Sequence, residues 1–171
     1  MKHIFLIGFM GTGKSTVAAC IHEQYGMEVI EMDEMIAEHE GMSIPDIFSH
    51  YGEEYFREAE TNLLCSLQKK QGCVVSCGGG AILRRQNVEI MKRSGHVVLL
   101  NAKPETILAR VKDDENRPLL QGKKNVIAIR ELMDARSDKY IEAADVVIQT
   151  DGKSAEAICK EIFMKIDTVG E

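Results

Sequence analysis

Residues 8–16 read GFMGTGKST, and they stand between a largely apolar run at 3–7 and a stretch with a helical pattern. Gly8, Gly13, Lys14 and Ser15 fit the spacing G-x-x-x-x-G-K-[ST], in which glycines let the backbone wrap around a phosphate chain and the following helix points its N-terminus at the same anion. This stretch therefore predicts a nucleotide phosphate site. The nucleotide-binding residues we expect in it are Gly11, Thr12, Gly13, Lys14, Ser15 and Thr16.

Strand-like and helical patterns alternate along the chain. The strand-like runs are 4–7, 28–31, 73–76, 97–100 and 146–148, and the helical patterns are 15–25, 33–40, 44–50, 53–71, 87–93, 104–112, 126–140 and 154–166. Alternation of this kind favours a three-layer α/β fold, a parallel sheet covered by helices on both faces, with ligands beyond the carboxyl ends of the strands. The 171 residues fit one domain. The charged segment 112–124, KDDENRPLLQGKK, is expected to be a mobile surface loop.

Composition narrows the classes of partner and compartment. The net charge of −6 disfavours a nucleic-acid binder, which normally carries a basic stripe. No long uncharged apolar stretch and no signal-type segment is present, so we expect a cytoplasmic protein with no membrane partner. The five cysteines lack the paired spacing of zinc or redox sites and are interpreted as reduced thiols.

A magnesium carboxylate is expected at the end of the second strand-like run. The stretch VIEMDE places Glu31 and Asp33 two residues apart, so they point to the same side while the backbone stays extended. One acid can hold metal-bound water while the other orients a substrate hydroxyl or accepts its proton. The alternative is that Asp33 only caps the next helix.

Glycines and arginines are candidates for the second substrate. The stretch SCGGGA exposes backbone N–H groups of Gly78, Gly79 and Gly80 after a strand-like run, although a plain strand-to-helix turn would have the same pattern. In a net acidic chain, an acidic ligand is better gripped by the planar fork of arginine than by lysine. This argument slightly favours Arg57 and Arg136.

Each of these arginines also has a plainer interpretation. Arg57 lies within helical reach of Glu53 and Glu60, and Arg136 similarly has acidic neighbours in the sequence. Arg117 in the segment 112–124 could close onto a transferring phosphate and expel water, or it could be a solvated loop charge.

Taken together, the chain resembles a shikimate kinase of the small P-loop type, from the first strand to the last helix. The resemblance rests on GFMGTGKST, EMDEMIAEHEGMSIPDIFSHYGEEYFREAE, VVSCGGGAI, RPLL and LMDARSDKY. It implies a P-loop, nucleoside monophosphate kinase-like fold with a five-stranded parallel sheet, a substrate-binding helical region at about 32–60 and a lid at about 112–124.

The resemblance also implies a reaction and its residues. The γ-phosphoryl group of Mg·ATP would pass to the 3-hydroxyl of shikimate, giving shikimate 3-phosphate and ADP on the route to chorismate and the aromatic amino acids. The catalytic residues would be Lys14, Asp33 and Arg117; the shikimate-binding residues would be Asp33, Arg57, Gly78, Gly79, Gly80 and Arg136. Arg110 and Arg117 would contact the nucleotide, Ser15 would bind Mg²⁺, and Glu31 would reach the metal through water. ATP and shikimate are the only partners expected, and the protein is expected to be a monomer.

One departure from the family pattern bears on the metal. Where the family commonly has an aspartate, this chain has Glu31, whose extra methylene displaces the carboxylate and predicts weaker or altered metal dependence. Two other functions stay open. The acceptor could be a gluconate-like acid or a nucleoside monophosphate, or the chain could be a nucleotide-binding regulator without catalysis.

Overall fold

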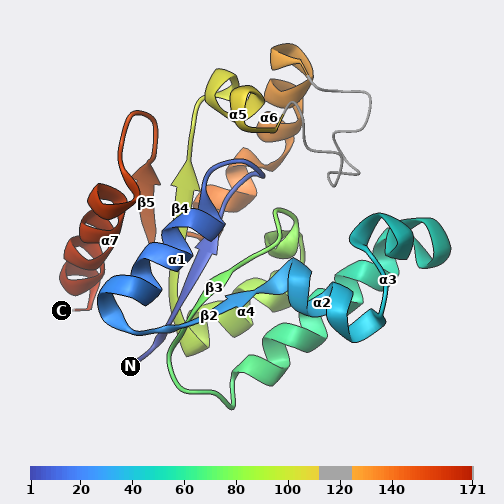
Figure 1. The fold of residues 1–171 in the computed structure, drawn as a ribbon, viewed down its shortest axis with the longest axis horizontal. Coiled ribbons are helices and arrows are strands. Elements are labelled where there is room, and N and C mark those ends of the chain that lie inside the picture. Colours follow the sequence, from blue (N-terminus) through green and yellow to red (C-terminus); the bar gives the residue numbers. More distant parts are fainter. Residues whose placement is uncertain (112–124, 171) are drawn as a thin grey trace.

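Five parallel strands form one sheet in the order β2-β3-β1-β4-β5 (Figure 1). The computed structural model describes residues 1–111 and 125–170. The strands are β1 (His3–Ile7), β2 (Glu28–Glu31), β3 (Cys73–Ser76), β4 (Gly95–Asn101) and β5 (Val146–Gln149). The helices are α1 (Lys14–Tyr25), α2 (Met32–Glu40), α3 (Ile44–Leu67), the 3-10 helix η1 (Ala81–Leu83), α4 (Arg85–Ser94), α5 (Pro104–Val111), α6 (Val126–Ala143) and α7 (Ala155–Val169).

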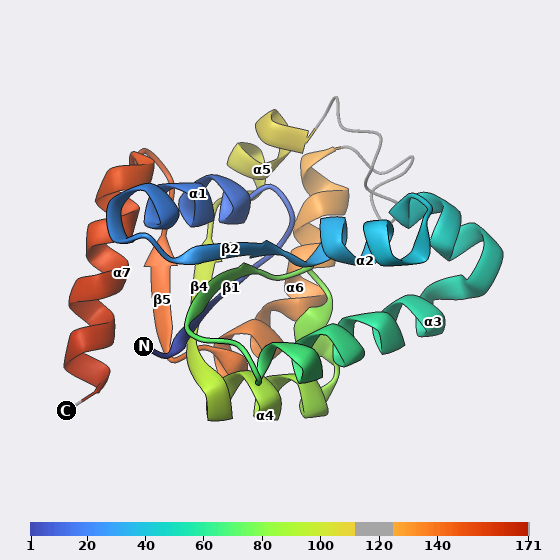
Figure 2. The ribbon, with the colours of Figure 1, turned by 60° about the horizontal axis from the view of Figure 1, so that its bottom comes forward.

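Helices cover both faces of the sheet because the strands are apolar on both sides. Alternate residues of β1 serve opposite cores: Ile4 and Leu6 pack with α1 and α7, whereas Phe5 and Ile7 pack with α3, α4 and α6. Figure 2 shows α1 and α7 on one side of the strands and α3, α4 and α6 on the other. Strands buried on both faces are typical of parallel sheets, and this sheet places the carboxyl ends of β1, β2 and β3 beside one another.

Local sequence explains where several helices begin and end. Gly26 and Gly41 end α1 and α2 in the left-handed conformation, which glycine adopts without steric cost. Ser43 caps α3 by accepting a hydrogen bond from the backbone N–H of Asp46. Gly52, with φ 84° and ψ 172°, interrupts the helical backbone inside α3, so the separate helical patterns at 44–50 and 53–71 correspond to its two halves.

The predicted five-stranded parallel α/β fold is confirmed, and three details differ. Helix α3 ends at Leu67, and residues 81–83 form a 3-10 helix that the sequence did not predict. Helix α2 begins at Met32, so the extended backbone assumed for Glu31 and Asp33 ends between them. The predicted lid at 112–124 lies outside the described residues. Along the described parts of the chain, no helix combines the length and the apolar character needed to cross a membrane.

Candidate active site

A cavity of about 670 Å³ opens at the carboxyl ends of β1, β2 and β3. This is the edge at which ligands collect in open parallel sheets. Most of the predicted site residues line it: Gly11, Gly13, Lys14, Ser15, Thr16, Glu31, Asp33, Gly78, Gly79 and Arg110. The sequence therefore located the cavity from four separate segments of the chain.

The loop between β1 and α1 forms one wall of this cavity. Gly13 has φ 96° and directly precedes the first turn of α1, so the chain enters the helix through a conformation that side chains rarely adopt. Lys14 Nζ donates to the carbonyl oxygens of Gly8 at 2.6 Å and Phe9 at 3.1 Å. Thr12 turns inward, where its hydroxyl donates to the carbonyl of Phe9 at 2.9 Å. Backbone N–H groups at a helix N-terminus together with a lysine form a site for phosphate.

Oxygen ligands suited to magnesium meet beside this loop. Ser15 Oγ donates to Glu31 Oε2 at 3.0 Å and lies 3.5 Å from Ser76 Oγ. A hydroxyl and one carboxylate, completed by water and phosphate oxygens, are the ligands that Mg²⁺ usually takes in proteins. The donor set therefore fits the ion, and Ser76 is a neighbour of it that sequence reasoning missed. Its position at the end of a strand was the available signal.

Asp33 reaches the cavity by a different geometry from the one predicted. It lies in the first turn of α2, while Glu31 occupies the cap position with extended backbone, so the two acids are not alternate residues of one strand. Both nevertheless line the cavity. The alternative that Asp33 caps the helix is wrong, because the cap residue is Glu31 and α2 has no side-chain cap.

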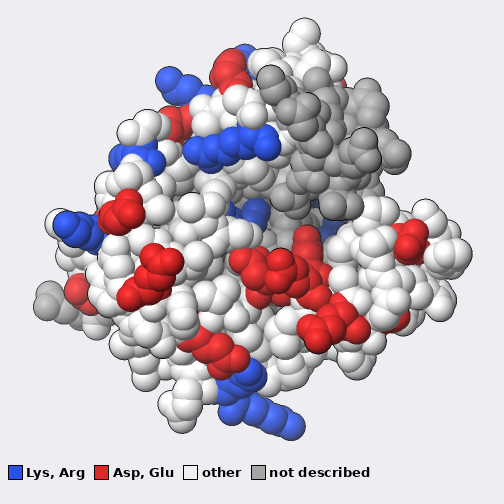
Figure 3. Space-filling model, viewed as in Figure 1, with Lys and Arg blue, Asp and Glu red and all other residues white. Residues whose placement is uncertain are grey.

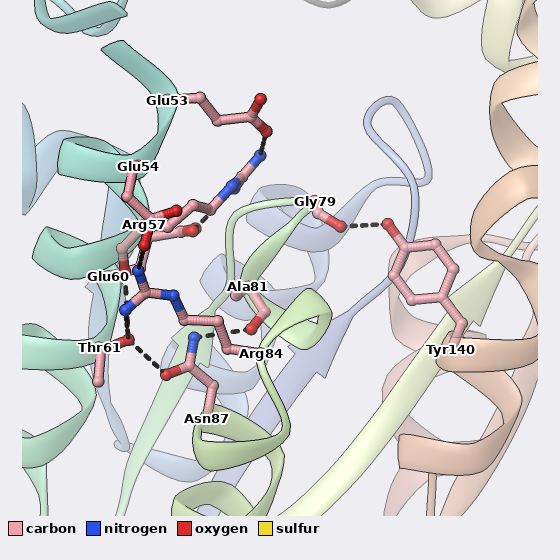
Figure 4. A network of polar contacts seen from close by, with 10 residues as sticks. All are labelled: Glu53, Glu54, Arg57, Glu60, Thr61, Gly79, Ala81, Arg84, Asn87 and Tyr140. Atoms are coloured by element: carbon pink, nitrogen blue, oxygen red, sulfur yellow. Dashed lines mark hydrogen bonds and ion pairs between the residues drawn. The ribbon is translucent and has the colours of Figure 1, made fainter. Parts of the chain in front are cut away.

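Arg57 is buried against the turn formed by residues 78–80, which we call the glycine turn. Its guanidinium donates to Glu60 Oε1 at 2.8 Å and to Glu53 Oε1 at 3.0 Å, so both acidic partners considered from the sequence are present (Figure 4). A Cβ on Gly80 would lie 2.5 Å from Cζ of Arg57. Glycine at this position therefore lets the turn lie directly on the guanidinium.

Glu60, which sequence reasoning treated only as a surface partner of Arg57, lies buried beside Gly78 at the cavity wall. Its side chain is fully buried, and burial raises its pKa to about 7, although Arg57 opposes this shift and Asp33 adds to it. A Cβ on Gly78 would meet both Glu60 Oε2 and Asp33 Oδ1 within 3.0 Å. The two carboxylates thus lie against the same glycine, and only the folded structure reveals this.

Helix α6 approaches the glycine turn from the other side. Arg136 and Tyr140 are four residues apart and face it together, because residues i and i+4 share a helix face. A Cβ on Gly79 would lie 3.6 Å from Arg136 Nη1, and the hydroxyl of Tyr140 donates to the carbonyl of Gly79 (Figure 4). Among the described residues, Arg136 Nη1 is buried without a hydrogen-bond partner, which suits it to an incoming anion.

Arg110 lines the cavity from α5. Its Nη1 donates to the carbonyl of Gly11 at 2.9 Å, so the side chain lies along the loop between β1 and α1. Arg117 lies outside the described residues, and the structure gives no position for it. Figure 3 shows acidic side chains gathered over α2 beside a hollow in which basic side chains are visible. The cavity thus combines positive charge for phosphate with carboxylates for a metal or a hydroxyl.

Comparison with known proteins agrees with this chemistry. The model of the shikimate kinase family matches residues 10–167. The chain is 42% identical to a shikimate kinase of Sulfurihydrogenibium sp. over 97% of its own length and 98% of that protein. It is 43% identical to a shikimate kinase of Geobacter sulfurreducens, covering 94% of this chain and 88% of that protein.

Solved structures give the same result. The structure of shikimate kinase from Acinetobacter baumannii in complex with shikimate superimposes with a TM-score of 0.93 at 36% identity, covering 98% of this chain and 94% of that chain. A gluconokinase from Sinorhizobium meliloti superimposes with a TM-score of 0.57 at 17% identity, covering 98% of this chain and 95% of that chain. At that identity the likeness shows a shared fold alone.

Proposed function

The chain belongs to the shikimate kinase family, and we propose that its cavity brings ATP and shikimate together for transfer of the γ-phosphoryl group to the shikimate 3-hydroxyl. The protein is an ATP-dependent phosphotransferase by this membership. The observation that carries the assignment to this cavity is its lining: the phosphate loop, the Ser15–Glu31 pair and Asp33 share one space of about 670 Å³.

We infer that the loop between β1 and α1 holds the nucleotide phosphates. Lys14 would move its ammonium from the loop carbonyls to the β- and γ-phosphates, and Arg110 would lie beside the bound nucleotide. Ser15 would bind Mg²⁺ directly, and Glu31 would hold one of the waters on the ion. When bound, the ion would neutralise charge on the phosphates. Phosphoryl transfer needs little covalent help, so positioning and charge neutralisation are the main contributions of the protein.

The acceptor would lie against the glycine turn. Arg136, with a buried Nη1 that has no hydrogen-bond partner among the described residues, and Arg57, beside Gly80, would bind the shikimate carboxylate. Gly78, Gly79 and Gly80 would allow the ring to approach the backbone. Asp33 would accept a hydrogen bond from the reacting hydroxyl and orient it toward the phosphate.

Three further expectations complete this proposal. Arg117 and the segment 112–124 would close over the nucleotide as a lid. The protein would act as a monomer in the cytoplasm, and its product, shikimate 3-phosphate, would feed the synthesis of chorismate and aromatic amino acids. No partner beyond the two substrates and Mg²⁺ is needed for the reaction.

Release of ADP by the purified protein tests the acceptor. With Mg·ATP, we expect turnover with shikimate well above that with gluconate, nucleoside monophosphates or no acceptor. Arg136→Ala should raise the KM for shikimate far more than the KM for ATP, because only the acceptor carries the carboxylate. Arg85→Ala is the matched control, since Arg85 is exposed and pairs with Glu89 four residues away.

The outcomes separate the alternatives. Turnover with another acceptor would support a kinase but would contradict the proposal that Arg57 and Arg136 bind the shikimate carboxylate. ATP binding without turnover of any acceptor would favour a regulatory protein. An equal rise of both KM values in Arg136→Ala would contradict its placement at the acceptor.

A further inference from the structure

Two buried side chains join the helix that carries Arg57 to the glycine turn. Thr61 follows Arg57 by one helical turn in α3, and Asn87 lies in the first turn of α4. Thr61 Oγ1 donates to Asn87 Oδ1 at 2.8 Å, and Asn87 Nδ2 donates to the carbonyl of Ala81 at 2.8 Å. Ala81 directly follows the glycine turn, so a chain of two hydrogen bonds runs from α3 to the turn (Figure 4).

The chemistry of the amide fixes the direction of this chain. The carbonyl of Ala81 can only accept, so Asn87 must present its NH₂ group there and its oxygen to Thr61. The hydroxyl of Thr61 has one proton and also lies 3.2 Å from the carbonyl of Arg57, but the contact with Asn87 is shorter. Thr61 is 4% exposed and Asn87 is 0% exposed, so water does not compete for either partner.

What the link holds in place is the contact between Gly80 and Arg57. The turn lies so close to the guanidinium that an added methyl group would overlap it. A change of a few tenths of an ångström between α3 and the turn would therefore move Arg57 relative to Gly79 and Gly80. Sites of this kind depend on supporting side chains that hold the binding groups to within about 0.5 Å.

Arg84 provides a second connection between the same elements, and its exposure makes it the weaker one. It pairs with Glu54 and Glu58, whose side chains are 88% and 61% exposed, and its Nη1 also donates to Thr61 Oγ1 at 3.3 Å. Exposed ion pairs contribute little to holding a geometry, because water and salt screen them. The buried link through Thr61 and Asn87 is thus the connection that decides the spacing.

We propose that Thr61 and Asn87 are positioning residues for the acceptor site: their buried hydrogen-bond chain sets the distance between Arg57 and the glycine turn. The proposal rests on the function proposed above, because it assigns the effect to shikimate binding. Thr61 and Asn87, like Arg57, do not line the cavity, whereas Gly78 and Gly79 of the turn do, so both would act by setting the position of Arg57 against the turn. Among the described residues, neither Thr61 nor Asn87 hydrogen-bonds to the loop between β1 and α1, on which ATP would bind.

Thr61→Val tests the proposal with little change in the shape of the side chain, since it replaces the hydroxyl by a methyl group. The variant loses the hydroxyl that donates to Asn87 and that also accepts from Arg84 Nη1 at 3.3 Å, so the KM for shikimate should rise by about three- to tenfold, with the KM for ATP changed less than about twofold. Thr61→Ser keeps the hydroxyl and should retain the parental KM for shikimate. Asn87→Ala should match Thr61→Val, and the double variant should be no worse than the more severe single one, because both break the same chain.

Ile90→Val is the matched control for a mere loss of stability. Ile90 is buried in α4 less than one turn beyond Asn87 and makes apolar contacts in the core, so this variant should lower the Tm while leaving the KM for shikimate at the parental value. Thr61→Ala replaces Thr61→Val if the valine variant does not fold.

Three results would overturn the proposal: a lowered Tm with an unchanged KM for shikimate in Thr61→Val, an equal rise in both KM values, or the same defect in Thr61→Ser. A parental enzyme without turnover of shikimate would instead refute the proposed function.

Discussion

Replacement of Gly80 by alanine tests whether the glycine turn needs direct contact with Arg57. The backbone of Gly80 has φ −101° and ψ 6°, which alanine adopts readily, so backbone strain does not contribute. The obstacle is the guanidinium, because a Cβ would lie 2.5 Å from Cζ and from Nη2 of Arg57. Carbon atoms at optimal contact lie about 3.5 to 4.0 Å apart, so Arg57 or the turn must move by about 1 Å.

The displacement sets the expected magnitude. Arg57 Nη1 lies 2.8 Å from Glu60 Oε1, and a shift of about 1 Å would break this charge-assisted hydrogen bond, which contributes about 1.5 to 3 kcal/mol. If the same free energy is lost from the binding of the transition state with shikimate, kcat/KM for shikimate falls by roughly 10- to 100-fold. For a chain of this size, the Tm should fall by roughly 5 to 10 °C.

A coupled assay of ADP release, with shikimate and ATP varied in turn, measures both KM values, and thermal unfolding gives the Tm. Gly79→Ala is the informative comparison, because a Cβ there has ordinary contacts of 3.6 Å with Arg136 Nη1 and 3.7 Å with Met10 N. Its loss of kcat/KM should be much smaller than that of Gly80→Ala. Parental kinetics and Tm in Gly80→Ala, or equal losses in the two variants, would refute the contact as the cause.

Three other variants test the nucleotide side and the buried acid. Lys14→Ala should lower kcat by about 10²- to 10³-fold while calorimetry finds the affinity for shikimate nearly unchanged; a large loss of that affinity would contradict the assignment. Glu31→Gln removes the charge beside Ser15 and should raise the Mg²⁺ concentration for half-maximal rate by roughly tenfold, which a metal titration measures; an unchanged requirement would exclude Glu31 from the metal site. Because burial raises the pKa of Glu60 from 4.5 to about 7, the native state binds the proton more tightly than the unfolded state. The contribution of Glu60 to the free energy of unfolding should then be largest below pH 4.5. It should fall by on the order of 3 kcal/mol as the pH rises through 7. Urea unfolding of Glu60→Gln should lack this fall, and the same pH dependence in both proteins would show that Glu60 is not its source.

The loop between β1 and α1 and its place at the cavity were predictable because its residues are close in sequence. The spacing of Gly13, Lys14 and Ser15 specifies a loop and a helix start by local backbone requirements alone. The same holds for the fold, since apolar runs of strand length between helical patterns predict a parallel sheet, and the structure confirms it. Gly52 was also visible as a gap between two helical patterns, although α3 continues beyond it.

The proposed acceptor side was only partly predictable because its chemistry depends on burial. Glu60 follows Arg57 by three residues, a spacing that is common for exposed ion pairs on helices. Its burial arises because a turn some 20 residues later in the chain packs onto this helix. Asn87 has no distinguishing sequence pattern, and its role depends on partners in α3 and η1. Contacts between distant segments of this kind cannot be obtained from periodicity.

The two arginines at the glycine turn differ in charge balance, and this has a consequence for acceptor selectivity. Arg57 already pairs with Glu53 and Glu60, so part of its positive charge is offset before a substrate carboxylate arrives. Arg136 forms no ion pair with any residue of the described ranges 1–111 and 125–170. Its positive charge is therefore less offset by paired carboxylates than that of Arg57. We therefore expect Arg136, more than Arg57, to make the site prefer shikimate over an analogue without the carboxylate. Arg57 would contribute mainly through the shape of the site.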